Sequence, residues 1–304
     1  MSLLKFSKEL VANQLLGVGP LRRLVDSISS RPSLAPQERD PNDIWSDPFH
    51  PELALRKFRR IQSLLGDPAW IRGKVIAEIG PGMSFGMGIV ALALGARRSV
   101  LVDREQYVTH DARGAAAHRA LLDLIPSWIP DADPRYRTCM HIDGDAVVPD
   151  GRTLLYAIAP AERLPLADGS VDLLVSHSTL EHIRHLDAAV AEFARITAPG
   201  GKNVHQVDLS DHLDPANPLR MLGLSARAWD LIASHRRGWT NRLRLSQYLA
   251  LFERYGLQVQ QVDVDRQLTQ EEMPRLRSQL HHDYRGLADS DLQALGFYCV
   301  LQRL

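Results

Sequence analysis

From residue 74 onward the sequence alternates short apolar runs with amphipathic segments, and this alternation restricts the fold more than any other feature. The first apolar run, 75–79, ends in a glycine turn at 80–82 and leads into a helical pattern at 85–94. Short buried strands that alternate with helices are typical of a parallel sheet with helices on both faces. The sequence therefore predicts a doubly wound, mainly parallel α/β domain.

The same alternation continues to the C-terminal end of the sequence. Further strands are expected at 99–103, 154–158, 171–176, 203–209, 256–264 and 296–301. Further helices are expected at 114–124, 186–196 and 245–255. Two stretches interrupt this pattern and are interpreted as insertions, at about 106–150 and 210–244, because they are longer than ordinary connections. Prolines 126, 130 and 134 predict a loop in the first of them.

Residues 1–72 have a different character, and we expect a helical N-terminal cover ahead of the domain at 73–304. Leucines recur at helical spacing over 3–16 and again over 21–28, and 53–65 reads as a basic amphipathic helix. A proline-rich stretch, 29–51, separates them. This cover and the second insertion are the candidate lid over a binding site, with a membrane-surface role for 3–16 as the less favoured alternative.

Charge and cysteine content exclude several functional classes. Lys plus Arg and Asp plus Glu both number 36, so no net field favours nucleic acid or an anionic membrane, and no nucleic-acid partner is expected. Two cysteines exclude a disulfide scaffold. The longest apolar run, 89–96, is far below the roughly 20 residues that span a bilayer. These features predict a cytoplasmic protein without a transmembrane segment and leave a homo-oligomer open.

The glycine turn that follows the first strand is the strongest candidate for a binding site. Gly80 and Gly82 allow a tight bend and close approach of a ligand to the backbone. A dinucleotide fingerprint would need a third glycine where this chain has Phe85. Glu78, two residues before the turn, would oppose a pyrophosphate and suit a cation. A phosphate cradle is therefore disfavoured, and a turn without a ligand remains the alternative.

A second acid follows the next strand. Asp103 ends the apolar run 100–102, where a carboxylate can accept hydrogen bonds from both hydroxyls of a ribose. The alternative is that Asp103 only caps the next helix. Glycine turn and strand-end acid together are less common than either feature alone, so we expect a nucleoside at the carboxyl edge of the sheet.

Five blocks in this order resemble the class I methyltransferases that use S-adenosylmethionine, in particular their small-molecule branch. The blocks lie at 75–82, 101–103, 161–172, 176–182 and 198–201. The resemblance implies a Rossmann-like, seven-stranded sheet and S-adenosylmethionine as the cofactor. This sequence differs from the family at Ser84, where a third glycine is common. Its stretch between 103 and 162 is also longer than is usual in the family.

The resemblance also implies roles for individual residues. Glu78 would lie near the methionine amino group, and Asp103 would hold the ribose. His177 would face the methionine moiety or the acceptor. The residues implied to border the cofactor are Glu78, Gly80, Pro81, Gly82, Asp103, Arg104, Ala161, Glu162 and His177.

Methyl transfer from a sulfonium is an in-line displacement, so the protein has to position the acceptor and, for an alcohol, remove its proton. Candidate bases follow the fourth and fifth strands and are His177, Glu181, His182, His205, Asp208, Asp211 and His212. Structural roles, a His–Asp base and a cation site at the aspartates are all open for this cluster. No metal-ligand spacing supports a metal. We take His177, His205 and Asp208 as the catalytic candidates.

Within the second insertion, residues 219–244 carry a surplus of arginines over a single acid, Asp230. They are Arg220, Arg227, Arg236, Arg237, Arg242 and Arg244. They could bind an acidic group on an acceptor, although a solvated face is the simpler interpretation.

The expected function is methyl transfer from S-adenosylmethionine to a small-molecule acceptor, on an oxygen of a sugar or secondary metabolite. The alternatives are a carbon or nitrogen methyltransferase and a catalytically silent, cofactor-binding partner subunit. A nicotinamide-dependent oxidoreductase is disfavoured by Phe85 and Glu78.

Overall fold

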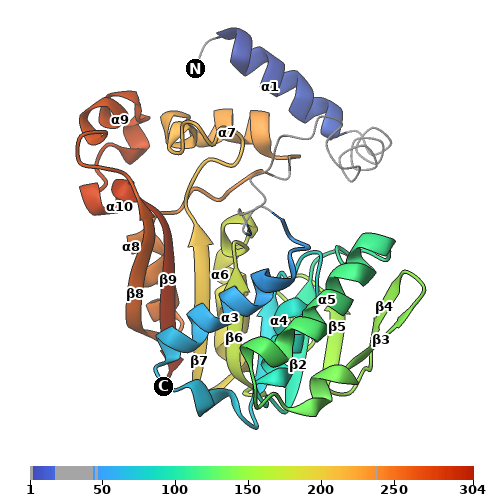
Figure 1. Ribbon diagram of the computed structural model, residues 1–304. Helices are drawn as coiled ribbons and strands as arrows, with labels where there is room; N and C mark the ends of the chain where they lie inside the picture. The colour runs from blue at the N-terminus through green and yellow to red at the C-terminus, as the bar shows by residue number, and fades with distance from the viewer. Residues whose placement is uncertain (1–2, 18–43, 45–46, 237) are drawn as a thin grey trace. The chain divides into compact units, whose positions relative to one another are not determined.

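The computed structural model describes residues 3–17, 44, 47–236 and 238–304 (Figure 1). The chain divides into two compact units. The sheet unit comprises residues 41–207, 247–263 and 298–304, and the helical unit comprises 1–40, 208–246 and 264–297. The predictions made for residues 21–28, for 29–43 and for Arg237 lie outside the described residues.

The sheet unit is built on a seven-stranded sheet. Its strands are β1 (Val75–Ile79), β2 (Arg98–Asp103), β5 (Leu154–Ile158), β6 (Val171–His177), β7 (Thr197–Asp208), β8 (Leu257–Gln267) and β9 (Ala294–Arg303). Their order across the sheet is β5-β2-β1-β6-β7-β9-β8. The pairs from β5 to β7 are parallel. The predicted doubly wound, mainly parallel fold is confirmed.

Helices cover both faces of this sheet. They are α3 (Pro51–Leu65), α4 (Gly86–Ala93), α5 (Ala112–Trp128), α6 (Leu186–Ile196) and α8 (Leu245–Arg254), with short helical turns η2 (Pro68–Ile71), η3 (Pro134–Arg137) and η4 (Leu180–His182). Successive residues of a strand point to opposite faces. Val204 of β7 accordingly joins the core beneath α3 and α4, whereas the next residue, His205, packs against α6 and α8.

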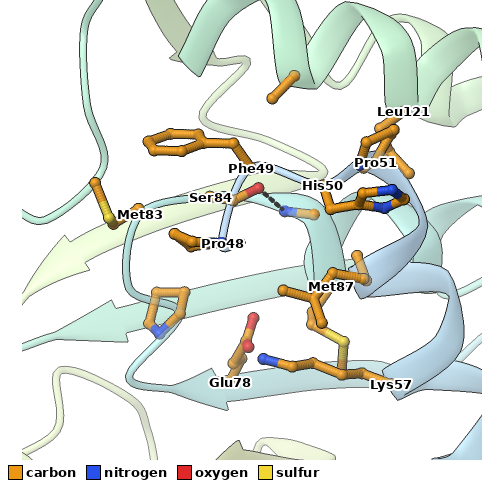
Figure 2. Close-up of a pocket in the computed structure, with 15 residues that line it drawn as sticks. Pro48, Phe49, His50, Pro51, Lys57, Glu78, Met83, Ser84, Met87 and Leu121 are labelled. Atoms are coloured by element: carbon orange, nitrogen blue, oxygen red, sulfur yellow. Dashed lines mark hydrogen bonds between the residues drawn. The ribbon is translucent and has the colours of Figure 1, made fainter. Parts of the chain in front are cut away.

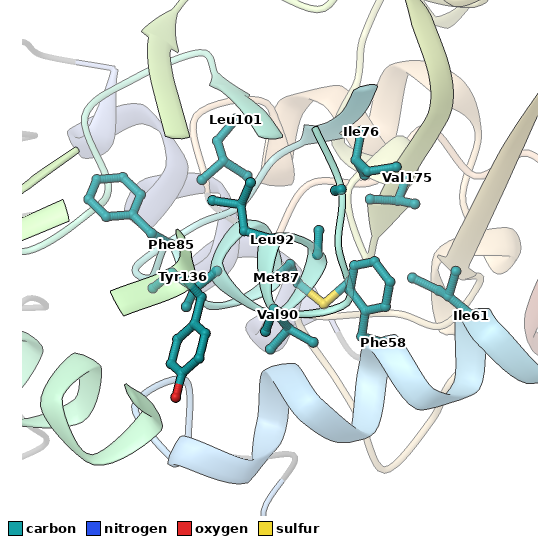
Figure 3. Close-up of a cluster of buried hydrophobic side chains, with 14 of the residues drawn as sticks. Phe58, Ile61, Ile76, Phe85, Met87, Val90, Leu92, Leu101, Tyr136 and Val175 are labelled. Carbon is teal, nitrogen blue, oxygen red and sulfur yellow. The ribbon is translucent and has the colours of Figure 1, made fainter. Parts of the chain in front are cut away.

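The core beneath α3 and α4 holds the first strand–turn–helix unit rigid. All eight residues of α4 are buried, which explains why its sequence is apolar around the whole helix. Phe58 of α3 packs beside Met87 and Val90 of α4, and Ile61 lies next to Phe58 in the same cluster (Figure 3). A Cβ at Gly88 would lie 2.8 Å from a methyl group of Leu154, so glycine permits the close packing of α4 on the sheet.

The region 106–150 differs from its predicted form. Pro126 lies inside α5, which continues to Trp128 instead of ending before the proline. A two-stranded antiparallel ribbon, β3 (Met140–Asp143) and β4 (Ala146–Pro149), follows where no strand was expected. Its strands are only four residues long, and four residues carry too little alternation to be recognised in a sequence.

The helical unit contains α1 (Leu3–Leu16), η5 (Arg220–Gly223), α7 (Ala226–Ala233), α9 (Met273–Gln279), η6 (His282–Tyr284) and α10 (Asp289–Gln293). Trp229 and Ile232 of α7 lie in its apolar core. Asn13 of α1 fixes that helix to α7 by donating to the carbonyl of Leu231 at 2.8 Å. The predicted N-terminal cover of 1–72 is thus divided, since α1 belongs to this unit and α3 to the sheet unit. None of the described helices has the length and apolarity needed to cross a bilayer.

Two arginines of the second insertion have structural roles. Arg220 forms ion pairs at 2.8 Å with Glu9 of α1 and with the buried Asp211. Arg244 is fully buried and donates to the main-chain carbonyls of Leu209, Asp291 and Ala294. Neither guanidinium is part of a solvated face, because Arg244 is buried and the side chain of Arg220, which is 10% exposed, is held by ion pairs.

We expect Arg244→Lys to destabilise the protein strongly. A lysine cannot reproduce the planar fork, so carbonyls now bound would remain buried without a donor. The free energy of unfolding, measured by chemical denaturation, should fall by about 2–4 kcal/mol. The control Arg227→Lys, at an exposed position of α7, should change it by less than about 0.5 kcal/mol. Equal stability of the two variants would contradict this role for Arg244.

Candidate cofactor site

The glycine turn between β1 and α4 adopts a conformation that requires glycine. Gly80 has φ 74° and Gly82 has φ 67°, both in the left-handed region. A Cβ at Gly80 would lie 2.5 Å from Oγ1 of Thr179, so the turn also packs tightly against the loop after β6. A Cβ at Gly82 would meet nothing within 4 Å, which leaves the backbone of that residue open to a ligand.

Asp103, the last residue of β2, connects its own strand end to the glycine turn. One carboxylate oxygen, Oδ2, accepts from the backbone amide of Gly82 at 3.1 Å, and Oδ1 accepts from the amide of Arg104 at 2.8 Å. Burial raises the pKa of Asp103, while these amide hydrogen bonds act to lower it. The residue does not cap the next helix, because Asp111 holds that position in α5. Arg104 is exposed and lies 3.5 Å from Glu105.

Glu78, the residue before the last of β1, places a buried carboxylate near the end of that strand, beneath the glycine turn. The side chain is 6% exposed, and its Oε2 atom has no hydrogen-bond partner. Burial raises the pKa of Glu78 to about 8, with Lys57 of α3 acting to lower it and Asp103 to raise it further. A buried carboxylate with an unsatisfied oxygen is unfavourable by itself and favours a cationic ligand.

A cavity opens over Glu78 between the glycine turn, α3 and α5. Figure 2 shows Glu78 and Lys57 on one side of it, with Pro48, Phe49 and His50 on the other. Its further lining includes Pro51, Leu53, Ala54, Pro81, Met83, Ser84, Gly86, Met87, Ala117 and Leu121. Ser84, which replaces the third glycine common in the family, accepts from the amide of Gly86, the first residue of α4, at 3.0 Å.

His118 supports the turn and escaped the sequence analysis. Its Nε2 accepts from the backbone amide of Phe85 at 3.0 Å, so Nδ1 carries the proton and donates to the carbonyl of Gly114 at 2.7 Å. Burial lowers the pKa of His118, which keeps the ring neutral and able to accept. The only signal in the sequence is a histidine within an Ala-rich helix, and that pattern does not reveal a partner 33 residues away.

The predicted residues near the ends of β5 and β6 lie in the connection between these strands and at the last position of β6. Ala161 is buried and Glu162 is half-buried in the connection between β5 and β6. His177 ends β6, with its Nε2 3.3 Å from the hydroxyl of Tyr298 and its Nδ1 3.3 Å from Oγ of Ser178. Ser178 has φ 49°, an unusual backbone conformation for a residue other than glycine. The structure thus gives His177 a partner on each ring nitrogen.

The structure does not place His205 where a base would work. Its ring is fully buried and stacks between Phe193 and Phe252, 5.6 Å from each ring centre. Burial lowers the pKa of His205 to about 3, and Nδ1 lies 2.8 Å from Oγ of Ser176. The sequence of a strand does not show which face of the sheet a histidine points to. In the structure His205 points to the face covered by α6 and α8.

Asp208 belongs to the helical unit, where its carboxylate is already engaged. Oδ1 accepts from the amide of Ser210 at 2.9 Å and pairs with Arg266 at 2.7 Å, and Oδ2 lies 3.4 Å from His212. Although burial acts to raise it, the bonds from His212 and Ser210 and the charge of Arg266 hold the pKa of Asp208 below its usual range. This carboxylate is a weak proton acceptor.

The geometry and chemistry of Glu78, Gly82 and Asp103 fit S-adenosylmethionine. Oε2 of Glu78 can accept from the ammonium group of the methionine moiety, and Asp103 has lone pairs left for a ribose diol. The backbone at Gly82 is open to close approach. Each part of the ligand therefore meets a group of suitable chemistry.

Comparison with known proteins agrees with this fit. Residues 78–205 match the family model described as a methyltransferase domain. The chain is 35% identical over 75 residues to the ubiquinone/menaquinone biosynthesis C-methyltransferase UbiE of Laribacter hongkongensis, covering 25% of this chain and 30% of that protein. It is 51% identical over 53 residues to the malonyl-[acyl-carrier protein] O-methyltransferase of Geobacter sulfurreducens, covering 17% and 20%.

Solved structures include an S-adenosylmethionine dependent methyltransferase from Mesorhizobium loti, with TM-score 0.45 and 15% identity over 79% of this chain and 100% of that one. The matched segments span less than a third of the two curated relatives. Residues 78–205 form a class I S-adenosylmethionine-dependent methyltransferase domain, and S-adenosylmethionine is the cofactor of that class. The predicted family and its cofactor are confirmed.

The raised pKa of Glu78 predicts a pH-dependent stability. Between its ordinary value of 4.5 and about 8, the folded protein holds this proton and the unfolded chain does not. Stability should therefore fall as pH rises through that window, by at most about 1.4 kcal/mol per pH unit from this group. Glu78→Gln removes the titration, so the stability of the wild type relative to this variant should decline from pH 5 to pH 8.

Denaturant unfolding at several pH values measures this difference. The control Glu253→Gln changes an exposed acid of α8 and should keep the wild-type slope. Parallel pH profiles for the wild type and Glu78→Gln would contradict the assignment.

Proposed function

We propose that the protein transfers a methyl group from S-adenosylmethionine to a hydroxyl oxygen of a small molecule such as a sugar or secondary metabolite. The observation that carries the proposal is the buried pair of acids joined to one glycine turn, Glu78 beneath it and Asp103 bonded to it. These groups match the cationic and ribose parts of the donor.

The chain's residues have separate tasks in the proposed reaction. The donor supplies an electrophilic methyl group on a sulfonium. Glu78 holds the ammonium group of the donor, and Asp103 holds the ribose hydroxyls. His177 accepts the proton of the acceptor hydroxyl as the oxygen–methyl bond forms and the sulfur–methyl bond breaks. Ser178, beside Nδ1, keeps the imidazole oriented, and the acceptor hydroxyl takes the place of the Tyr298 hydroxyl at Nε2. Of the three predicted catalytic groups, the proposal retains His177 alone.

Asp103→Asn should weaken donor binding. The amide would present a donor group to the Gly82 amide or to the ribose, where acceptors are needed. We expect the Kd for S-adenosylmethionine, measured by calorimetry, to rise at least about tenfold, as for loss of a charge-assisted hydrogen bond. Asp131→Asn, at an exposed position, serves as the control. An unchanged Kd for Asp103→Asn would refute its role.

Acceptor chemistry is tested with labelled donor and a panel of hydroxylated, amine and activated-carbon compounds. We expect turnover with hydroxylated acceptors, and His177→Gln should reduce kcat/KM by about 10²–10⁴-fold and abolish the acidic limb of its pH profile. The control His141→Gln, at an exposed position of β3, should keep the wild-type kcat/KM and the acidic limb. Turnover with amines alone would exclude the oxygen acceptor.

A carbon acceptor is the second candidate. It is supported by the similarity to the C-methyltransferase UbiE over 75 residues, beside a comparable similarity to an O-methyltransferase. Nuclear magnetic resonance of the product distinguishes a new C–CH₃ group from an O–CH₃ group. Donor binding without turnover on any acceptor would instead indicate a catalytically silent partner subunit.

A further inference from the structure

The cavity over the glycine turn contains two opposite charges that face each other. Glu78 reaches it from β1, and Lys57 reaches it from α3, with the amine of Lys57 directed at the Glu78 carboxylate (Figure 2). The two residues come from segments of the chain that are 21 positions apart and belong to different elements. No spacing in the sequence indicates that they meet.

Lys57 occupies an unusual position on its helix. The neighbouring basic residues Arg56 and Arg59 are exposed, whereas Lys57 lies on the side that carries Leu53 and Ala54 into the cavity wall. Burial lowers the pKa of Lys57, and the Glu78 carboxylate opposes that effect. A lysine placed on the inner side of an amphipathic helix is unfavourable unless an anion offsets its desolvation.

His50 is the other basic side chain in the cavity lining, and it is already engaged. Its Nδ1 accepts from the backbone amide of Glu52 at 3.2 Å, as the N-cap of α3. Lys57 is therefore the lining residue suited to an anionic group of a ligand, while Oε2 of Glu78 lacks a hydrogen-bond donor.

The methionine end of the donor is a zwitterion, with an ammonium and a carboxylate on the same carbon atom. Glu78 can hold the ammonium only, which would leave the carboxylate to be desolvated in the cavity without a counter-charge. We propose that Lys57 binds the α-carboxylate of S-adenosylmethionine while Glu78 binds its ammonium group, so that α3 and β1 together recognise the amino-acid end of the donor. This inference rests on the proposed function.

Decarboxylated S-adenosylmethionine provides the test, because it keeps the ammonium and lacks the carboxylate. Calorimetry gives the Kd of S-adenosylmethionine, S-adenosylhomocysteine and the decarboxylated donor for each variant. Lys57→Met should weaken binding of the first two at least about tenfold and change the third by less than about twofold. Glu78→Gln should weaken all three, since each carries the ammonium.

Arg56→Met is the matched control on the same helix, because Arg56 is exposed and pairs with Glu52. It should leave all three affinities unchanged. Lys57→Gln replaces Lys57→Met if the latter does not fold, as judged by circular dichroism, and the same pattern is expected. Equal losses for the donor and its decarboxylated form, or no loss for either, would overturn the role of Lys57. Absence of any binding by the wild type would refute the proposed function together with this inference.

Discussion

The hydrogen bond from the Gly82 amide to the Asp103 carboxylate is the interaction on which the site depends. It joins the ends of β1 and β2, adjacent parallel strands, and so fixes the glycine turn relative to a strand-end acid. The left-handed conformation at Gly80 and Gly82 makes this bond geometrically accessible. Beneath the same turn, Glu78 is buried on the strand, where its charge is destabilising until a cation approaches.

The strand–turn–helix unit and most of the sheet could be predicted from the sequence, because apolar runs and glycines act locally. The helix at 186–196 has the predicted bounds, and α3 begins two residues before its predicted start. The short β3–β4 ribbon could not be predicted, because neither strand is long enough to show a period. Assigning α1 to a unit with 208–246 depends on contacts such as Asn13 to Leu231, more than 200 residues apart.

In the site as well, residues whose role follows from their own strand could be predicted, whereas residues whose role depends on distant partners could not. Glu78 and Asp103 could be predicted as site residues because each lies at or near the end of a strand beside the glycine turn. His118 and Lys57 were missed, since their importance comes from partners on other elements. His205 was misplaced for a related reason: strand alternation gives two faces but does not say which one borders the ligand. The surplus of arginines at 219–244 was ambiguous in sequence, and contacts with distant carbonyls and acids resolve it for Arg220 and Arg244.

We propose that two acids, Glu78 and Asp103, and one glycine turn seat the donor at the carboxyl edge of the sheet. A crystal structure of the complex with S-adenosylhomocysteine would test this arrangement. We predict ribose hydroxyls within hydrogen-bond distance of Asp103, and the amino group beside Glu78. Electron density for the nucleoside away from Gly82 and Asp103 would contradict the account, as would an amino group remote from Glu78.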